Sequence, residues 1–231
     1  MKKKLLLATL LAVAGTGAMA QSKFEGFYGQ VGVGFSSVSP STNSTSLTPP
    51  AGNTPSSYSL ATSIDSTNSF AGAIGLGYTF AVAPKFTIGL GADYLPFNGQ
   101  SGNFTISNSG LSPSSQTGTF KQKQSYDIYI APGFEVTTDG ILYGKFGYAG
   151  TNVEYATTGS QNFSGYLVGL GYKQMITGGF YGFAEANYTS YGEQNVSATG
   201  RWDSGTTGTY TINGKMSANA FTGLIGVGYK F

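Results

Sequence analysis

The chain has 231 residues, of which only 10% are charged, and it contains neither cysteine nor histidine. The lack of cysteine excludes a disulfide scaffold, and the lack of histidine removes most metal sites and every nucleophile that needs a histidine base. We therefore expect no metal or other cofactor. The formal net charge of +2 gives no support to nucleic-acid binding, because three of the 12 basic residues lie in an expected export signal.

That export signal is expected over residues 1–20. Three lysines at positions 2–4 precede a short apolar run, and Ala18-Met19-Ala20 gives the small-residue pattern of a cleavage site. A membrane-spanning helix is the alternative, but the run is too short for the roughly 20 residues that a span requires. We expect this segment to be removed, which leaves residues 21–231 as one domain with nine basic and ten acidic residues.

From residue 26 onward the chain carries short segments in which every second residue is apolar. The other residues are mostly small or charged, and no segment has helical periodicity. Alternation of this kind is typical of β-strands with two unlike faces. Eight such segments are predicted: 26–35, 69–80, 86–94, 125–136, 141–150, 165–174, 180–191 and a last one from about 218 to 231.

The connections between these segments alternate in length. Three are tight turns, at 81–85, 137–140 and 175–179, whereas the others are long, at 36–68, 95–124, 151–164 and 192–217. This alternation indicates an antiparallel meander, and in an outer-membrane barrel the short turns are periplasmic and the long loops extracellular. Residues 38–59 include no charged residue and are rich in Ser, Thr and Pro, so we expect them to be mobile.

The apolar faces can meet either a sandwich core or lipid. Three observations favour lipid: rings lie near both ends of the apolar faces, the segments are about ten residues long, and the charged residues within them lie on the opposite face. The predicted fold is an all-β, eight-stranded antiparallel up-and-down transmembrane β-barrel. Eight strands enclose a lumen that side chains can fill, so an open channel is not expected.

The inward face carries rings, glycines and charges. We expect large lumen aromatics to pack over glycines of neighbouring strands and plug the lumen, with glycines of the last strand covered chiefly by Tyr28. Lys145 and Glu185 are expected to meet across the lumen, and Pro132 is expected to cause a bulge or local irregularity. A gate or proton path is the alternative role for these charges. The predicted lumen aromatics are Tyr28, Tyr143, Tyr181 and Phe183, and the predicted lumen network is Asp127, Glu135, Lys145, Lys173 and Glu185.

The segment FAEANYTSYG, residues 183–192, and the ending GVGYKF, residues 226–231, resemble a known family. They are similar to the small outer-membrane β-barrel proteins of Gram-negative bacteria, the OmpA/OmpX-type barrels and the surface-antigen "porin family". The resemblance implies a place in the cell outer membrane, among lipid and lipopolysaccharide. It also implies an assembly signal read by the barrel assembly machinery, at Ile225, Val227, Tyr229 and Phe231.

Three classes of function remain to be weighed. Catalysis is not expected, because most barrel hydrolases of this kind depend on histidine. The favoured function is structural or surface interaction, with loops that contact a host or phage surface; the alternative is a narrow porin or carrier for small or hydrophobic solutes. Rings in the loops are candidate contacts, and three basic residues near the outer rim are candidates for lipid phosphates. These residues are Tyr58, Phe104, Phe120, Trp202 and Tyr210, and Lys121, Lys123 and Arg201.

Overall fold

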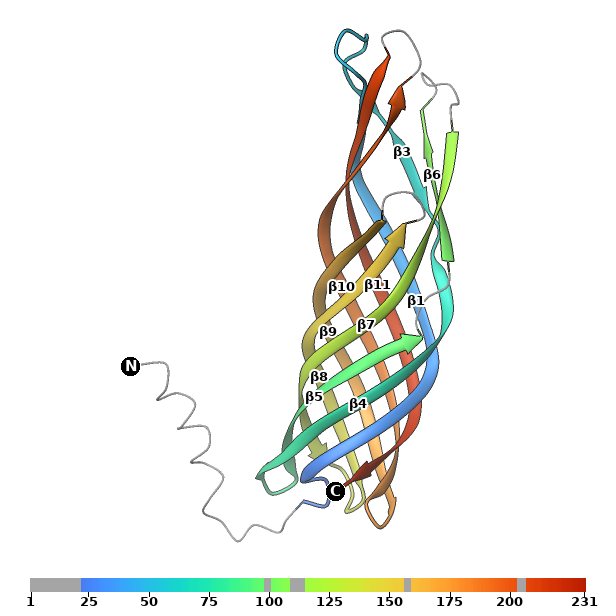
Figure 1. Ribbon diagram of the computed structural model, residues 1–231. Helices are drawn as coiled ribbons and strands as arrows, with labels where there is room; N and C mark the ends of the chain where they lie inside the picture. Colours follow the sequence, from blue (N-terminus) through green and yellow to red (C-terminus); the bar gives the residue numbers. More distant parts are fainter. Residues whose placement is uncertain (1–21, 98–100, 109–114, 156–158, 203–206) are drawn as a thin grey trace, which may run out of the picture.

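The computed structural model describes residues 22–97, 101–108, 115–155, 159–202 and 207–231, and all its regular elements are strands. No helix in these residues is long and apolar enough to cross a membrane. The strands form one elongated tube (Figure 1). Their bounds are β1 (Gly26–Thr48), β2 (Tyr58–Ser59), β3 (Ala61–Ile64), β4 (Thr67–Ala83), β5 (Phe86–Phe97), β6 (Ser101–Ser107), β7 (Ser115–Glu135), β8 (Gly140–Tyr155), β9 (Gly159–Thr177), β10 (Phe180–Trp202) and β11 (Gly208–Lys230).

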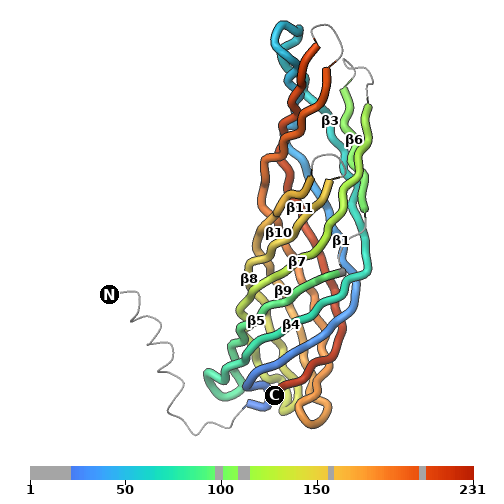
Figure 2. The backbone as a smooth tube through the Cα atoms, in the orientation of Figure 1, coloured from blue at the N-terminus to red at the C-terminus, as the bar shows by residue number. Residues whose placement is uncertain are grey.

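Eight of these strands form a closed antiparallel ring, in the order β1, β4, β5, β7, β8, β9, β10 and β11. The ring closes because β11 pairs with β1 from Tyr28 opposite Lys230 upward. The trace in Figure 2 shows the strands inclined around a common axis. Closure leaves no unpaired strand edge in the hydrocarbon layer, which a spanning sheet requires. The predicted eight-stranded barrel is confirmed.

Tight turns lie together at one end of the tube, where β1 begins and β11 ends (Figure 1). Gly178 and Gly179 join β9 to β10 as a two-residue loop, and both have positive φ, of 54° and 89°. Positive φ at both central residues is the geometry of a hairpin turn whose twist matches that of the strands. The short turns mark this end as periplasmic, as predicted.

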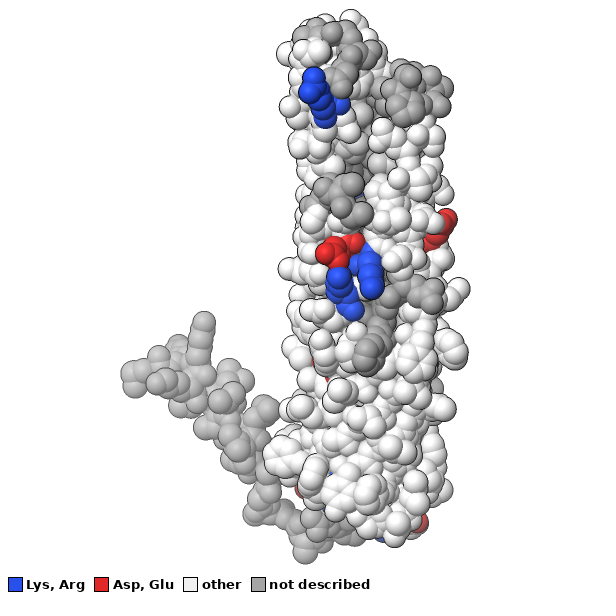
Figure 3. Space-filling model, turned by 45° about the vertical axis from the view of Figure 1, so that its right-hand side comes forward, with Lys and Arg blue, Asp and Glu red and all other residues white. Residues whose placement is uncertain are grey.

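The outer face of the ring is apolar over the height of the membrane. Ile225 and Leu76 are 65% and 67% exposed, as expected for side chains that meet lipid rather than water. Outward rings contact one another near the periplasmic end, where Tyr229 lies 4.8 Å from Phe180 and 5.1 Å from Phe231 between ring centroids. Figure 3 shows one face on which charged side chains are sparse along the lower part of the tube. The lipid-facing assignment of the alternating apolar residues is therefore confirmed.

Several strands continue far beyond the predicted segments, on the extracellular side. β1 reaches Thr48, β10 reaches Trp202 and β7 begins at Ser115, so much of the sequence expected to form long loops is strand, including residues 38–48 that were expected to be mobile. Above the ring the sheet divides into two ribbons. Pairing of β1 with β4 stops at Val38 opposite Thr67, and pairing of β10 with β9 stops at Tyr191 opposite Gly165. One ribbon then consists of β10, β11, β1 and β2, and the other of β3, β6 and β7.

A one-residue bulge accompanies this division in each of three strands. The register shifts lie between Asn43 and Ser46 in β1, between Gln122 and Ser125 in β7, and between Tyr191 and Gln194 in β10. An extra residue reverses which side chains face inward, and it bends the strand. The inward positions of β10 thus change from odd numbers, such as Tyr191, to even numbers, such as Val196. This reversal is one reason why a single alternating pattern did not reveal these long strands.

Pro132 produces the local irregularity that was one of the two expected outcomes, but not a bulge. It pairs with Ile88 of β5 in unbroken register, and the register of β7 with β8 is the same on both sides of it. The pairing of β7 with β8 is interrupted between Ile130 and Gly133. The missing N–H of proline thus leaves a gap in one ladder without adding a residue.

Candidate functional site

Each predicted lumen aromatic packs over a glycine that is directly opposite it on a neighbouring strand. A Cβ atom on any of these glycines would overlap the facing ring. All four rings are buried, with at most 7% of their surface exposed. The pairs are Tyr28 with Gly77, Tyr143 with Gly171, Tyr181 with Gly228, and Phe183 with Gly226.

The sequence-based partner of Tyr28 was wrong. Its ring lies over Gly77 of β4, whereas Gly226 and Gly228 of the last strand are covered by rings from β10. The reason is register, because Tyr28 faces Lys230 on β11 and a glycine only on β4. A ring can lean over a neighbour only where that neighbour has no side chain.

Lys173 lies among these rings rather than in an ion pair with Glu135. Its Nζ is 3.8 Å from the ring centre of Tyr28, and 5.2 and 5.0 Å from those of Tyr143 and Tyr181. An ammonium over ring faces is stabilised by their quadrupoles, most strongly where water is excluded. Glu135 is the last residue of β7 and accepts a hydrogen bond from the Ser22 hydroxyl at the periplasmic end. The prediction that Glu135 joins the lumen network is therefore wrong, because Glu135 lies beyond the enclosed lumen.

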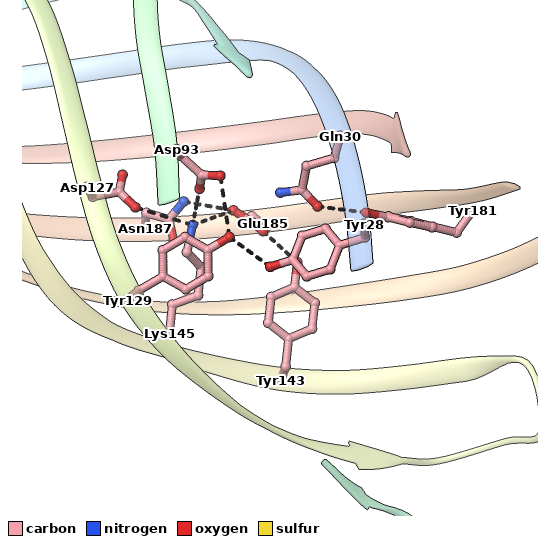
Figure 4. A network of polar contacts seen from close by, with 10 residues as sticks. All are labelled: Tyr28, Gln30, Asp93, Asp127, Tyr129, Tyr143, Lys145, Tyr181, Glu185 and Asn187. Carbon is pink, nitrogen blue, oxygen red and sulfur yellow. Dashed lines mark hydrogen bonds and ion pairs between the residues drawn. The ribbon is translucent and has the colours of Figure 1, made fainter. Parts of the chain in front are cut away.

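Lys145 of β8 forms the centre of a buried charge cluster (Figure 4). Its fully buried Nζ lies 2.5 Å from Oδ2 of Asp93, 3.1 Å from Oε2 of Glu185 and 3.9 Å from Oδ1 of Asp127. It also lies 3.9 Å from the ring centre of Tyr129. The three carboxylates come from β5, β10 and β7, so one ammonium joins strands on different sides of the barrel. The expected meeting of Lys145 with Glu185 is present.

Hydrogen bonds join the charge cluster to the ring layer below it. The Tyr143 hydroxyl donates to Oε1 of Glu185 at 2.6 Å, and the Tyr129 hydroxyl donates to Oδ1 of Asp93 at 3.3 Å. The hydroxyls of Tyr28 and Tyr129 lie 3.2 Å apart. Buried polar groups are stabilising only when they are paired, and here the phenols supply donors that a single lysine cannot. We call the rings and charge cluster together the lumen plug: Tyr28, Asp93, Asp127, Tyr129, Tyr143, Lys145, Lys173, Tyr181, Phe183 and Glu185.

Sequence reasoning missed two members of the plug and one neighbour. Asp93 was placed on the inward face but not in the network, although it is the nearest carboxylate to Lys145. Tyr129 covers Gly91 and makes two of the plug's hydrogen bonds. Asn187 donates to Oε2 of Glu185 at 3.2 Å. Asp93 and Tyr129 lie at inward positions opposite Asp127 and Gly91 on the paired strands β5 and β7, a signal that strand register supplies but single segments do not.

The lumen plug leaves little free space inside the membrane-spanning ring. One cavity of about 30 Å³ lies among the rings, and another of about 30 Å³ lies above the charge cluster. A volume of this size holds about one or two water molecules. Pairing of charges and filling of space both indicate a closed lumen.

The four residues of the expected assembly signal lie on the outer face at the end of β11. Ile225, Val227 and Phe231 are more than half exposed, and Tyr229 is half-buried between neighbouring rings. The backbone N–H of Phe231 donates to the carbonyl of Phe27 at 2.9 Å, so this last residue joins the seam between β11 and β1.

Comparisons with known proteins agree with this geometry. Residues 6–231 match the family model described as "Outer membrane protein beta-barrel domain". The chain belongs to this family. This outer-membrane barrel is similar in fold to the outer membrane protein OprG from Pseudomonas aeruginosa, with 14% identity, a TM-score of 0.58, and coverage of 91% of this chain and 99% of that one.

Two further solved structures are similar over nearly their whole length. Neisserial surface protein A is 16% identical, with a TM-score of 0.46 and coverage of 90% of this chain and 98% of that one. Ail, the attachment invasion locus protein of Yersinia pestis, is 14% identical, with a TM-score of 0.41 and coverage of 90% and 99%. No curated protein matches this barrel in sequence.

Among the described residues of this barrel, we find no group of three or more Asp or Glu side chains placed to hold a metal ion.

Rings in the extracellular part pack on one another. Trp202 lies 6.0 Å from Tyr58 and 6.3 Å from Tyr210 between ring centroids. Lys123 pairs with Glu154 at 2.5 Å. Candidate loop contacts thus also have structural roles.

Proposed function

We propose that this outer-membrane barrel is a non-enzymatic structural and surface-interaction protein whose lumen does not conduct solutes. The observation that carries the proposal is the lumen plug, beside which the described residues enclose cavities of only about 30 Å³. A path for solute would require the Lys145 ion pairs to break, which leaves charges buried without partners. The closed barrel therefore serves as a base for the extracellular strands and not as a passage for solutes.

The surface role is supported by the extent of the extracellular part. The ribbons extend the tube well above its membrane-spanning part (Figure 1). They carry exposed ion pairs, as between Lys215 and Glu193 at 3.4 Å, and can present rings and polar groups beyond the lipopolysaccharide layer. Adhesion, a surface-antigen role or envelope integrity fits this arrangement, with a host or phage surface ligand as the partner.

Conductance of the full chain in planar lipid bilayers tests the closed lumen. We expect no stepwise current from the wild-type protein. A variant with Tyr129→Ala, Tyr143→Ala and Lys145→Ala removes two plug rings and the lysine whose ion pairs block the path, and it should conduct. A variant with Tyr172→Ala and Tyr166→Ala, which remove outward rings of β9, should not. Steady current from the wild type would contradict the proposal and favour the alternative, a narrow porin or carrier.

We also propose that residues 1–20 are a cleaved signal and that Ile225, Val227, Tyr229 and Phe231 are read by the barrel assembly machinery. The outward position of these side chains at the end of β11, the strand that closes the ring against β1, supports this proposal. Deletion of Phe231 should lower the amount of assembled barrel in the outer membrane while export continues, as measured by membrane fractionation. Phe221→Ala is the control: it removes an outward ring of β11 that lies outside the expected signal, and it should leave the amount of assembled barrel unchanged. Normal assembly without Phe231 would refute the assignment.

A further inference from the structure

A much larger cavity lies outside the membrane-spanning ring, between the two extracellular ribbons. Its volume is about 390 Å³, and its walls come from β1, β10 and β11 on one side and from β3, β6 and β7 on the other, with Tyr155 of β8. Pockets for small molecules commonly have volumes of ~300–1,000 Å³. The cavity is thus large enough for a ligand, whereas the spaces within the lumen plug are not.

The chemistry of the walls restricts the ligand. None of the lining residues is charged, so an ion would lose its hydration without gaining a partner. The remaining polar groups are hydroxyls and one amide, scattered between apolar side chains. The apolar walls are Ile64, Phe104, Ile106, Val196, Ile212 and Met216.

One residue of the walls carries a buried polar atom without a protein partner. Thr62 lines the cavity, and its buried Oγ1 atom makes no hydrogen bond in the structure. By contrast, the Tyr155 hydroxyl donates to Sδ of Met216 at 3.5 Å, and the hydroxyls of Thr105 and Thr117 lie 3.2 Å apart. A buried hydroxyl without a partner is costly, so the Thr62 hydroxyl marks where a ligand's polar group would be stabilised.

The cavity is closed beneath and bordered on one side by two strand edges. Met216 in its wall packs against a buried apolar cluster that includes Val38, Phe163 and Tyr191 and continues to Tyr129 and Tyr143 of the lumen plug, so packed side chains lie between the cavity and the lower lumen. In the described part of the chain, β10 beyond Tyr191 pairs only with β11, and β7 before Phe120 pairs only with β6. Residues 116–118 and 196–199 in the walls belong to these two strand edges. We call this closed-bottomed cavity the cup.

We propose that this cup binds an uncharged, largely apolar small molecule whose hydroxyl or carbonyl group bonds to the Thr62 hydroxyl. The ligand is held on the extracellular side and is not passed through the barrel, because the floor and the lumen plug lie beneath it. This binding role is separate from the proposed structural role and does not depend on it.

Bromodecanol is a suitable probe, because bromine quenches a nearby indole and the chain has a single tryptophan. Trp202 lies at the far end of β10, and its ring is 6.3 Å from that of Tyr210 in the cavity wall. Probe dissolved in the bilayer is too far away to reach it. With the full chain in lipid nanodiscs, we expect saturable quenching by bromodecanol and at least tenfold weaker quenching by the charged bromodecanoate.

Three variants test the site itself. Ala198→Phe fills the cavity and should abolish saturable quenching, whereas Asn195→Phe places the same ring on the outward face of β10 and should not. Thr62→Val keeps the shape of the side chain but removes its hydroxyl. It should weaken the binding of bromodecanol roughly threefold to tenfold and leave the binding of bromodecane unchanged. Folding of each variant is checked by its resistance to unfolding in SDS. Quenching that does not saturate, or that Ala198→Phe leaves intact in a folded barrel, would overturn the proposal.

Discussion

The two halves of this barrel enclose their interiors in opposite ways. Within the membrane the lumen is full, with Lys145 held by three carboxylates and with rings lying over glycines. Above the membrane the ribbons enclose about 390 Å³ without a charged residue in the walls. A ring of eight strands has a fixed, narrow radius that side chains can fill, whereas two ribbons that are no longer paired can stand apart. The division of the sheet, more than composition, therefore decides where space for a ligand exists.

The largest expected effect is on the charge cluster. Lys145→Met keeps a side chain of similar length but leaves three carboxylates buried together, and removal of one partner from a buried ion pair costs about 3–5 kcal/mol. The free energy of unfolding, measured by urea titration in lipid vesicles, should fall by about that amount. Lys215→Met breaks an exposed pair and should cost no more than about 1 kcal/mol. Equal effects of the two substitutions would show that the cluster does not stabilise the lumen.

A smaller effect is expected where a ring covers a glycine. Gly171→Ala would place a Cβ against the Tyr143 ring, and overpacking of this kind costs about 1–3 kcal/mol. Gly29→Ala is the matched control, because no atom lies within 4 Å of the Cβ it would add. The same urea titration should show loss of stability for the first variant and little change for the second. Similar values for both would contradict the packing of rings against glycines.

The contrast between the halves also explains how much the sequence could predict. Lipid and lumen impose opposite demands on alternate residues, so strands such as 69–80 and 165–174 were recognisable from period two alone. Residues 38–48 meet water or a weakly apolar cavity, so their Ser- and Thr-rich sequence lacks an apolar face. A bulge between Asn43 and Ser46 also exchanges their inward and outward positions. This part of the strand therefore resembled a loop in the sequence. The Lys145 cluster was predicted in part, through Glu185. Asp93 and Tyr129 were missed because their contacts depend on register between strands, which no single segment contains.

The smallest expected effect is at the periplasmic rim. Lys23 donates a hydrogen bond to Asp139 at 2.6 Å, and this bond holds the pKa of the Asp139 carboxyl below its usual value of 3.8. A carboxyl whose pKa is lowered by folding stabilises the folded state above its unfolded pKa, and this contribution is lost as the pH falls through the lowered value. Asp139→Asn should therefore lower Tm slightly at pH 7, and the difference should shrink as the pH falls below 3.8 and disappear below the lowered pKa of Asp139. A difference that persists in acid would show that the ion pair is not its cause.

Thiol labelling from outside the cell compares the two interiors most directly, because the chain has no cysteine of its own. Ala198→Cys places a thiol in the cavity between the ribbons, and Ala131→Cys places one in the wall of the lower lumen cavity. A membrane-impermeant maleimide added to intact cells should label the first variant readily and the second not at all. Labelling of both at similar rates would mean that the lumen is open from end to end, and it would contradict the account of a filled barrel beneath a cup.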